Sequence, residues 1–268
     1  MPKIERLLIT GAAGRLGTQY RRHVAGRYPS LRLSDRVGMG EAGAGEELVV
    51  CDLGDAAAVD RLFEGVDACV HLGGQPNEAP WPVIMNANIT GVVNVWEAAR
   101  KAGTRRIVFA SSNHATGFQP RSRRTDHHAP ARPDTRYGLS KAFGEDVAAY
   151  YANKHGIEAM CMRIGTCRAE PHDQRALSSW QSYPDFCRLV DVGLSADLVY
   201  EIVYGVSNNP RSWWDNSNAE RLGYRPQDSA EGWAGRLEGI VSPQPMDELF
   251  QGGPYCSPEF TGDLDRIV

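Results

Sequence analysis

The chain has 268 residues, a net charge of −4 and a hydrophobic content of 42%, which suit one large globular unit able to bury its own core. Acidic and basic residues are interspersed, so no basic face indicates nucleic acid and no polybasic run indicates an anionic membrane surface. No apolar run is long enough to span a bilayer, and a strand-like stretch begins too early to leave room for a signal peptide. We therefore expect a soluble protein whose partners are small molecules.

The cysteines form neither a CxxC pair nor a small disulfide framework, and several lie in apolar runs where a thiol behaves as a small hydrophobe. They are Cys51, Cys69, Cys161, Cys167, Cys187 and Cys256. This usage fits a reducing, cytoplasmic compartment. No paired His/Cys spacing suggests a metal site, so no metal is expected.

In the first part of the chain, short apolar runs alternate with helical stretches. Strands are expected at 4–10, 31–34, 47–52, 67–72 and 106–111, and helices at 15–25, 56–64 and 83–101. The second of these helices would bury Val59, Leu62 and Phe63, and the third would end at Gly103. Such alternation is typical of parallel strands joined by helices.

Residues 119–135 are rich in Arg, His, Pro and Asp, which predicts a surface connection over a cleft. A helix over 137–155 and a strand over 158–164 follow. After Gly165 the alternation fails, with a helix near 185–192, a strand at 198–206, and one helix and a Pro/Gly-rich tail beyond Asn216. We predict a single α/β domain over 1–268, a Rossmann-type doubly wound parallel sheet in which 166–268 supply a small C-terminal substrate-binding cap.

The turn Gly11-Ala12-Ala13-Gly14-Arg15-Leu16-Gly17 lies between a predicted strand and a predicted helix. Glycines there permit a tight turn, let backbone amides approach a pyrophosphate and aim a helix N-terminus at the anion. An ordinary loop is the alternative for a bare glycine pattern. The flanking strand and helix favour a dinucleotide.

Asp35 ends the second predicted strand, where a carboxylate would bind the adenosine ribose and repel a 2′-phosphate. This favours NAD over NADP, although Asp35 could simply form a turn and Arg36 leaves some NADP use open. Asp52 ends the third strand and could meet the adenine or cap the helix that begins near Ala56.

Tyr137 and Lys141 are four residues apart on a predicted helix, so both side chains project from one face. A tyrosine has a pKa near ~10, and a neighbouring ammonium, helped by the positive nicotinamide ring, would stabilise the phenolate. Ser111 and Ser112 close the fifth strand at its carboxyl end, where ligands bind in open parallel sheets. Tyr-x-x-x-Lys also occurs on helices by chance, but this combination and order favour an acid–base site.

With Tyr137-Gly138-Leu139-Ser140-Lys141, these features resemble the extended short-chain dehydrogenase/reductases over roughly the first two-thirds of the chain. The resemblance implies Ser112 as catalytic serine, Asn88 beside the nicotinamide, and Lys141 on the nicotinamide ribose. The cofactor contacts that we expect are Gly11, Gly14, Arg15, Leu16, Gly17, Asp35, Asp52, Leu53, Leu72, Gly73, Gly74, Asn88, Tyr137, Lys141 and Ile164.

A narrower resemblance is to the uronate dehydrogenases, which oxidise the anomeric carbon of galacturonate or glucuronate to an aldarate lactone. It rests on four stretches: His71-Leu72-Gly73-Gly74, Phe109-Ala110-Ser111-Ser112-Asn113-His114, Arg163-Ile164-Gly165-Thr166-Cys167 with Glu170-Pro171 and Arg175 following, and Trp213-Trp214-Asp215-Asn216. In other extended members the sixth strand usually ends in Arg-Pro and the chains are longer.

An anionic sugar needs a fixed cation, and Arg175 offers a two-nitrogen fork for its carboxylate unless it is a solvated surface arginine. The expected substrate contacts are Gln75, Ser112, Asn113, His114, Tyr137, Thr166 and Arg175. Gln75 and Thr166 stand where the resemblance suggests serines, so the specific uronate stays open. His114 could instead be structural, and Trp180, Trp213 and Trp214 are expected to pack rather than to stack on sugar.

The predicted function is NAD-dependent oxidation of a uronic acid, with Tyr137 as base. Two alternatives stay open: a sugar epimerase or dehydratase that returns the hydride, and a protein that senses NAD without turnover. Homo-oligomerisation is also left open.

Overall fold

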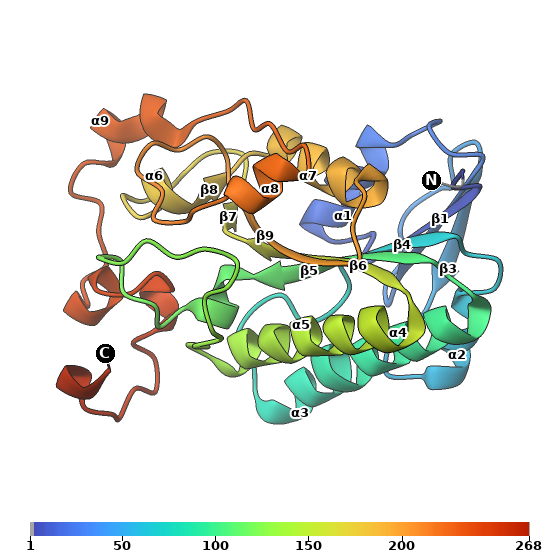
Figure 1. Cartoon of the computed structure of the whole chain (residues 1–268), viewed down its shortest axis with the longest axis horizontal. Helices are drawn as coiled ribbons and strands as arrows, with labels where there is room; N and C mark the ends of the chain where they lie inside the picture. Colours follow the sequence, from blue (N-terminus) through green and yellow to red (C-terminus); the bar gives the residue numbers. More distant parts are fainter. Residues whose placement is uncertain (1–2, 268) are drawn as a thin grey trace. The chain divides into compact units, whose positions relative to one another are not determined.

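A seven-stranded sheet in the order β3-β2-β1-β4-β5-β6-β9 organises the computed structural model, which describes residues 3–267 (Figure 1). Its strands are β1 (Arg6–Thr10), β2 (Ser30–Asp35), β3 (Glu46–Val50), β4 (Ala68–His71), β5 (Arg106–Ser112), β6 (Glu158–Ile164) and β9 (Tyr200–Gly205). β1 pairs in parallel with both β2 and β4. The strand order therefore reverses beside β1, which is the switch point where doubly wound sheets bind ligands.

Helices cover both faces of this sheet, as the sequence predicts (Figure 1). On one side lie α1 (Arg15–His23) and α7 (Tyr183–Ser195), joined where the Tyr20 hydroxyl donates to Asp191 at 2.9 Å. On the other lie α2 (Ala56–Leu62), α4 (Gly91–Ala102) and α5 (Arg136–His155), with Trp96 of α4 stacked on Tyr151 of α5. Val59, Leu62 and Phe63 are buried, as predicted. The strand order, with helices on both faces of the sheet, confirms the predicted doubly wound α/β fold.

The helix expected over 83–101 is less regular than its apolar pattern suggests. It comprises α3 (Trp81–Ile84), a π-helical segment η1 (Met85–Thr90) and α4, which ends at Gly103 in the left-handed conformation. A π-helical turn widens the helix and re-aims its side chains, and such turns recur at functional sites. Asn88 lies within this segment.

Beyond residue 165 the chain continues the α/β pattern once more. The sequence analysis placed the strand at 198–206 in the cap, whereas β9 joins the main sheet beside β6. The remaining segments are short: β7 (Thr166–Cys167) pairs with β8 (Trp180–Gln181), and the helices are α6 (Ala176–Ser179), α8 (Ser217–Arg221) and α9 (Ala234–Leu237). From residue 238 to residue 267 the tail forms single 3-10 turns, such as η5 (Gly253–Tyr255).

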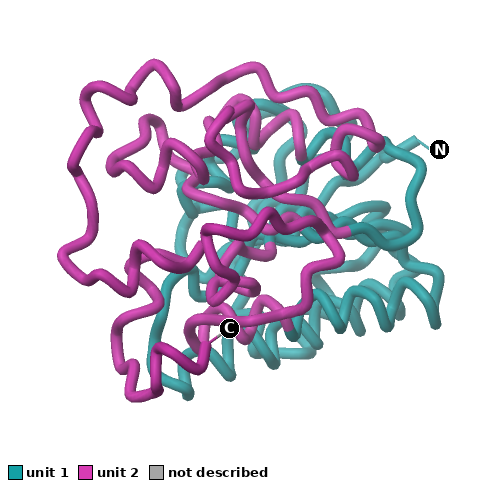
Figure 2. Tube along the Cα trace, turned by 60° about the vertical axis from the view of Figure 1, so that its left-hand side comes forward, with its two compact units in different colours: residues 1–110, 143–161, 190–201 teal, residues 111–142, 162–189, 202–268 magenta. Residues whose placement is uncertain are grey.

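The chain divides into two compact units (Figure 2). Unit 1 comprises residues 1–110, 143–161 and 190–201, and unit 2 comprises residues 111–142, 162–189 and 202–268. We expect a single domain in which residues 166–268 form the substrate-binding part, and this stays a prediction. No helix among the described residues is long and apolar enough to cross a membrane.

Candidate active site

The glycine turn of unit 1 is packed too tightly for side chains. Gly11 has φ +70°, and a Cβ there would lie 2.7 Å from the backbone nitrogen of Gly73. A Cβ on Gly17 would lie 2.1 Å from the Gly11 carbonyl oxygen. Helix α1 begins after Gly14 with no side chain capping its amides. The turn therefore fits a pyrophosphate, because backbone amides at a helix start lie open to an anion.

Two acidic residues lie at the carboxyl ends of neighbouring strands of unit 1: Asp35 is the last residue of β2, and Asp52 follows the end of β3 by two residues. The Asp35 carboxylate accepts a hydrogen bond from the Ala13 amide at 3.0 Å, so it lies beside the glycine turn. Asp52 accepts from the Gly54 amide at 2.8 Å. The cap of α2 is Asp55, which accepts from the Ala58 amide, and this sets aside the alternative that Asp52 caps the helix.

Asn88 holds the backbone that follows β4. Its Oδ1 accepts from the Gln75 amide at 2.7 Å and its Nδ2 donates to the Gln75 carbonyl at 3.1 Å. Gly74 has φ +137°, and a Cβ there would lie 2.8 Å from Asn88 Oδ1. A Cβ on Gly73 would meet the Leu53 side chain at 2.8 Å. The expected cofactor residues of unit 1 thus gather at the carboxyl ends of β1, β2 and β4.

In unit 2, the expected acid–base residues lie together and are buried. A side-chain hydrogen bond joins Tyr137 to Ser112, and Lys141 Nζ lies 5.5 Å from the centroid of the Tyr137 ring. Thr135 fixes the start of α5, because its Oγ1 accepts from the Gly138 amide at 2.9 Å. Ser112 also accepts from the His114 amide at 3.2 Å. Tyr137 and Lys141 are only 9% and 7% exposed.

The protein groups alone do not acidify this phenol. Burial raises the pKa of Tyr137 to about 12, and the proximity of Tyr255 and Asp134 adds to the rise. The hydrogen bond with Ser112 lowers it only in part. Lys141, which we expect to stabilise the phenolate together with the positive nicotinamide ring, is not among the groups that lower this pKa. A phenolate at neutral pH therefore needs a further positive charge beside the ring.

Arg175 lies in a cluster of neutral acceptors. Its Nε and Nη2 donate to the Gln251 carbonyl at 3.0 and 2.5 Å, and its Nη1 donates to Thr166 Oγ1 at 3.2 Å and Ser179 Oγ at 3.4 Å. Among residues 3–267 no carboxylate forms an ion pair with it. Burial lowers the pKa of the guanidinium from its ordinary value, and the nearby charges of Asp173 and Asp134 oppose this only in part. A solvated surface arginine would not have these contacts.

Asn113 joins the same cluster. In its hydrogen-bonded orientation the amide nitrogen donates to the Ile164 carbonyl at 3.0 Å, and the amide oxygen accepts from Arg175 Nη2 at 3.0 Å. The structure thus brings together four predicted residues: Asn113, Ile164, Thr166 and Arg175. It gives Asn113 protein partners at both amide atoms, where the sequence analysis expected a sugar hydroxyl.

Several residues that the sequence analysis did not select complete unit 2. The Gln251 side chain is fully buried and accepts from Trp214 Nε1 at 2.8 Å. Asp134 pairs with His114 Nδ1 at 2.7 Å, and Tyr255 stacks on the His114 ring at a centroid distance of 4.0 Å. Trp214 stacks on Tyr204 and Trp180 lies in an apolar cluster, which confirms packing roles for both tryptophans.

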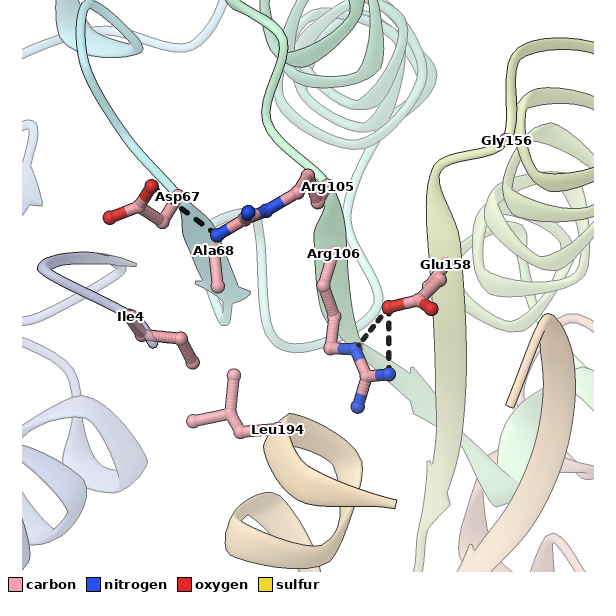
Figure 3. Close-up of a pocket in the computed structure, with 8 residues that line it drawn as sticks. All are labelled: Ile4, Asp67, Ala68, Arg105, Arg106, Gly156, Glu158 and Leu194. Atoms are coloured by element: carbon pink, nitrogen blue, oxygen red, sulfur yellow. Dashed lines mark hydrogen bonds and ion pairs between the residues drawn. The ribbon is translucent and has the colours of Figure 1, made fainter. Parts of the chain in front are cut away.

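A pocket of about 230 Å³ lies in unit 1 at the opposite, amino ends of β4, β5 and β6 (Figure 3). Its charged side chains are paired with one another: Arg105 with Asp67 at 3.5 Å, and Arg106 with Glu158 at 2.7 Å. Parallel sheets bind ligands at their carboxyl ends, and none of the expected site residues lines this pocket.

Comparison with known proteins places these features in a family. A profile of the NAD dependent epimerase/dehydratase family matches residues 7–180. The chain is 48% identical to a uronate dehydrogenase from Pseudomonas putida, covering 94% of this chain and 95% of that protein. It is 46% identical to the crystal structure of a glucuronic acid dehydrogenase from Chromohalobacter salexigens, with a TM-score of 0.92 and coverage of 98% and 100%. A uronate dehydrogenase variant from Agrobacterium tumefaciens, complexed with NAD, is 43% identical with a TM-score of 0.90 and coverage of 95% and 97%.

Proposed function

Because this chain belongs to the NAD dependent epimerase/dehydratase family and matches uronate dehydrogenases along nearly its whole length, we propose that it oxidises a uronic acid at the anomeric carbon with NAD. The cyclic sugar loses a hydride from that carbon and a proton from its hydroxyl, and it leaves as the lactone of an aldaric acid. Two electrons and one proton reach the cofactor as hydride, and the second proton reaches Tyr137.

The observation that best supports this proposal is that the Arg175 guanidinium forms no ion pair with any carboxylate among residues 3–267. It is a partly buried cation whose contacts among residues 3–267 are all with neutral oxygens. The charges of Asp173 and Asp134 act on the guanidinium, but burial outweighs them and neither carboxylate forms an ion pair with it. A buried charge is costly unless an opposite charge offsets it, so the site favours an anionic substrate. A neutral aldose would leave this cost in place, whereas the carboxylate of a uronate removes it.

The arrangement also refines how the carboxylate binds. The edge formed by Nε and Nη2 already faces the Gln251 carbonyl, so the two-nitrogen fork expected from the sequence is taken by the protein. The contacts of Nη1 with Thr166 and Ser179 are longer, at 3.2 and 3.4 Å. We place the substrate carboxylate at Nη1, where it replaces these weak bonds and accepts from Thr166.

Tyr137 acts as the base and Ser112 orients the reacting hydroxyl. The hydrogen bond between them aligns both groups on one substrate oxygen. Lys141 holds the cofactor ribose and favours the phenolate. NAD, when bound to the glycine turn, supplies the hydride acceptor and a positive ring that opposes the rise in the Tyr137 pKa caused by burial. His114 and Gln75 bind further sugar hydroxyls, whereas Asn113 positions Arg175.

Coenzyme choice and location follow from other residues. Asp35, held beside the glycine turn, would repel the 2′-phosphate of NADP. All six cysteines are buried and free, which supports a reducing compartment such as the cytoplasm. Homo-oligomerisation stays a prediction.

The test is NADH absorbance with purified protein and three substrate classes: galacturonate and glucuronate, the matching neutral aldoses, and sugar nucleotides. We expect steady NADH release with a uronate and a far lower kcat/KM with the neutral aldose. An epimerase or dehydratase would instead convert a sugar nucleotide without net NADH. Equal use of uronate and aldose would contradict the role given to Arg175.

A further inference from the structure

The carboxylate of Asp134 is buried beside the histidine that we expect to contact the sugar. His114 Nδ1 lies 2.7 Å from Asp134 Oδ2, and the Asp134 side chain has no exposed surface. Its other contacts are the Thr135 hydroxyl, which donates to Oδ1 at 2.9 Å, and the weakly polar thiol of Cys256 at 4.0 Å. Among residues 3–267 no lysine or arginine pairs with it. The imidazole is therefore the ionisable side chain in direct hydrogen-bond contact with this carboxylate, and the charge of Arg175 also acts on it.

Three glycines hold this carboxylate in one position. A Cβ on Gly117 would lie 1.9 Å from Asp134 Oδ2, and a Cβ on Gly252 would lie 2.0 Å from it. A Cβ on Gly138 would lie 3.0 Å from Oδ1 and 2.3 Å from the His114 carbonyl oxygen. Gly117 lies in a loop, Gly252 in the tail and Gly138 in the first turn of α5. Segments far apart in the sequence therefore lack side chains where the Asp134 carboxylate lies.

The pairing determines which nitrogen of His114 carries its proton. A carboxylate can only accept hydrogen bonds, so Nδ1 must donate to it. In the neutral ring Nε2 is then an acceptor, and Nε2 has no hydrogen-bond partner among residues 3–267. Tyr255 stacks on the ring with an interplanar angle of 25°, and Tyr137 meets it edge-on at 6.0 Å. The ring is thus fixed in plane and direction beside the proposed base.

We propose that Asp134 is a positioning residue that holds His114 with its proton on Nδ1, so that Nε2 accepts a hydrogen bond from a sugar hydroxyl near the reacting carbon. The inference rests on the proposed function, in which His114 contacts the sugar. It adds a requirement for substrates, because the sugar must present a hydroxyl donor to Nε2. An ether or a deoxy position there would leave the acceptor without a partner.

The first test reads the tautomer and needs no substrate. Long-range ¹H–¹⁵N spectra at pH 8 report which ring nitrogen of each histidine is protonated, and the spectrum of His114→Ala assigns the signals of His114. We expect protonation at Nδ1 in the wild type. In Asp134→Asn the amide can donate to Nδ1, so we expect a large population protonated at Nε2. An Nε2-protonated ring in the wild type, or no change in the variant, would overturn the proposal.

The second test is a kinetic cycle with His114→Ala, Asp134→Asn and the double variant. Asp134→Asn should raise the KM for uronate about tenfold while the KM for NAD is unchanged, by analogy with the carboxylate partners of metal-ligating histidines, whose loss costs about 10–100-fold. In the His114→Ala background the same substitution should change the uronate KM no further. Independent, additive penalties would show that the carboxylate does not act through His114.

Asp191→Asn is the matched control. Asp191 also pairs with a histidine, His23, at 2.8 Å, but the pair lies in unit 1 and is partly exposed. This variant should leave the uronate KM unchanged. A wild type that oxidises no uronate would contradict the proposed function, whereas the tautomer measurement decides the positioning role by itself.

Discussion

The expected site residues of the two units differ in kind. In unit 1 the expected cofactor contacts depend mainly on the backbone. Gly11 and Gly17 leave no room for a Cβ, and Asn88 hydrogen-bonds to the main chain of Gln75. In unit 2 the residues are buried polar side chains that hold one another, such as Arg175 with Gln251 and His114 with Asp134. A shared phosphate group can be bound by backbone shape, whereas a particular acidic sugar requires side-chain chemistry.

This difference implies that changes at Tyr137 and Arg175 in unit 2 alter turnover or the uronate KM, while changes in the glycine turn of unit 1 alter the affinity for the dinucleotide. The largest effect is expected for Tyr137→Phe. Removing the hydroxyl should lower kcat by about 10²–10⁴-fold, the usual contribution of a general base, while the dissociation constant of NAD stays near its wild-type value. Turnover and NAD titration measure the two quantities, and near-normal turnover would defeat the proposed base.

The pH dependence sharpens the same point. The fold raises the pKa of Tyr137 to about 12, so the phenol is neutral near pH 7 and must lose its proton for catalysis. The wild-type kcat/KM should therefore rise with pH, because the phenolate fraction grows. The residual activity of Tyr137→Phe should lack this rise.

Arg175→Ala should give the next largest effect. Without the guanidinium, the KM for uronates should rise about 10–100-fold, the range for hydrogen bonds to charged groups, while the KM for a neutral aldose changes little. Arg168→Ala removes an exposed arginine of the same unit and serves as the control. Equal losses for charged and neutral sugars would contradict the carboxylate contact.

Gly11→Ala tests whether the backbone of the glycine turn binds the cofactor. Gly11 and Gly26 have nearly the same φ, +70° and +73°, but a Cβ on Gly26 would meet nothing within 4 Å. Gly26→Ala should therefore cost only the left-handed strain of about 1–2 kcal/mol. Gly11→Ala should also displace Gly73 and weaken NAD binding about tenfold or more, on the scale of a 1.4 kcal/mol penalty. Equal melting temperatures and NAD affinities in the two variants would contradict the close approach.

A smaller effect is expected at Asp35. Removing its charge should narrow the preference for NAD over NADP several-fold, in line with about 1 kcal/mol for an exposed charge interaction. Asp35→Asn keeps an acceptor for the Ala13 amide and Asp35→Ala does not, so the pair separates repulsion of phosphate from support of the turn. An unchanged preference in both variants would remove the ribose role.

How well the site residues of each unit could be predicted depends on how far apart in the sequence the interacting residues lie. The glycine turn and the Tyr137/Lys141 pair are local sequence patterns, which can be recognised because the predicted strands and helices beside them are known. The acceptor that fixes Arg175 is the carbonyl of Gln251, 76 residues away, and the ring on His114 is Tyr255 of the tail. No spacing rule links such residues. The π-helical segment around Asn88 was also missed, since an apolar helical pattern does not distinguish one helix width from another.

Transfer of the anomeric hydrogen tests the central claim most directly. A uronate carrying deuterium at its anomeric carbon should give reduced cofactor that contains one deuterium on the nicotinamide ring, together with an unlabelled lactone, and mass spectrometry can follow both. Reduced cofactor without deuterium, or a sugar product that keeps it, would contradict oxidation at that carbon.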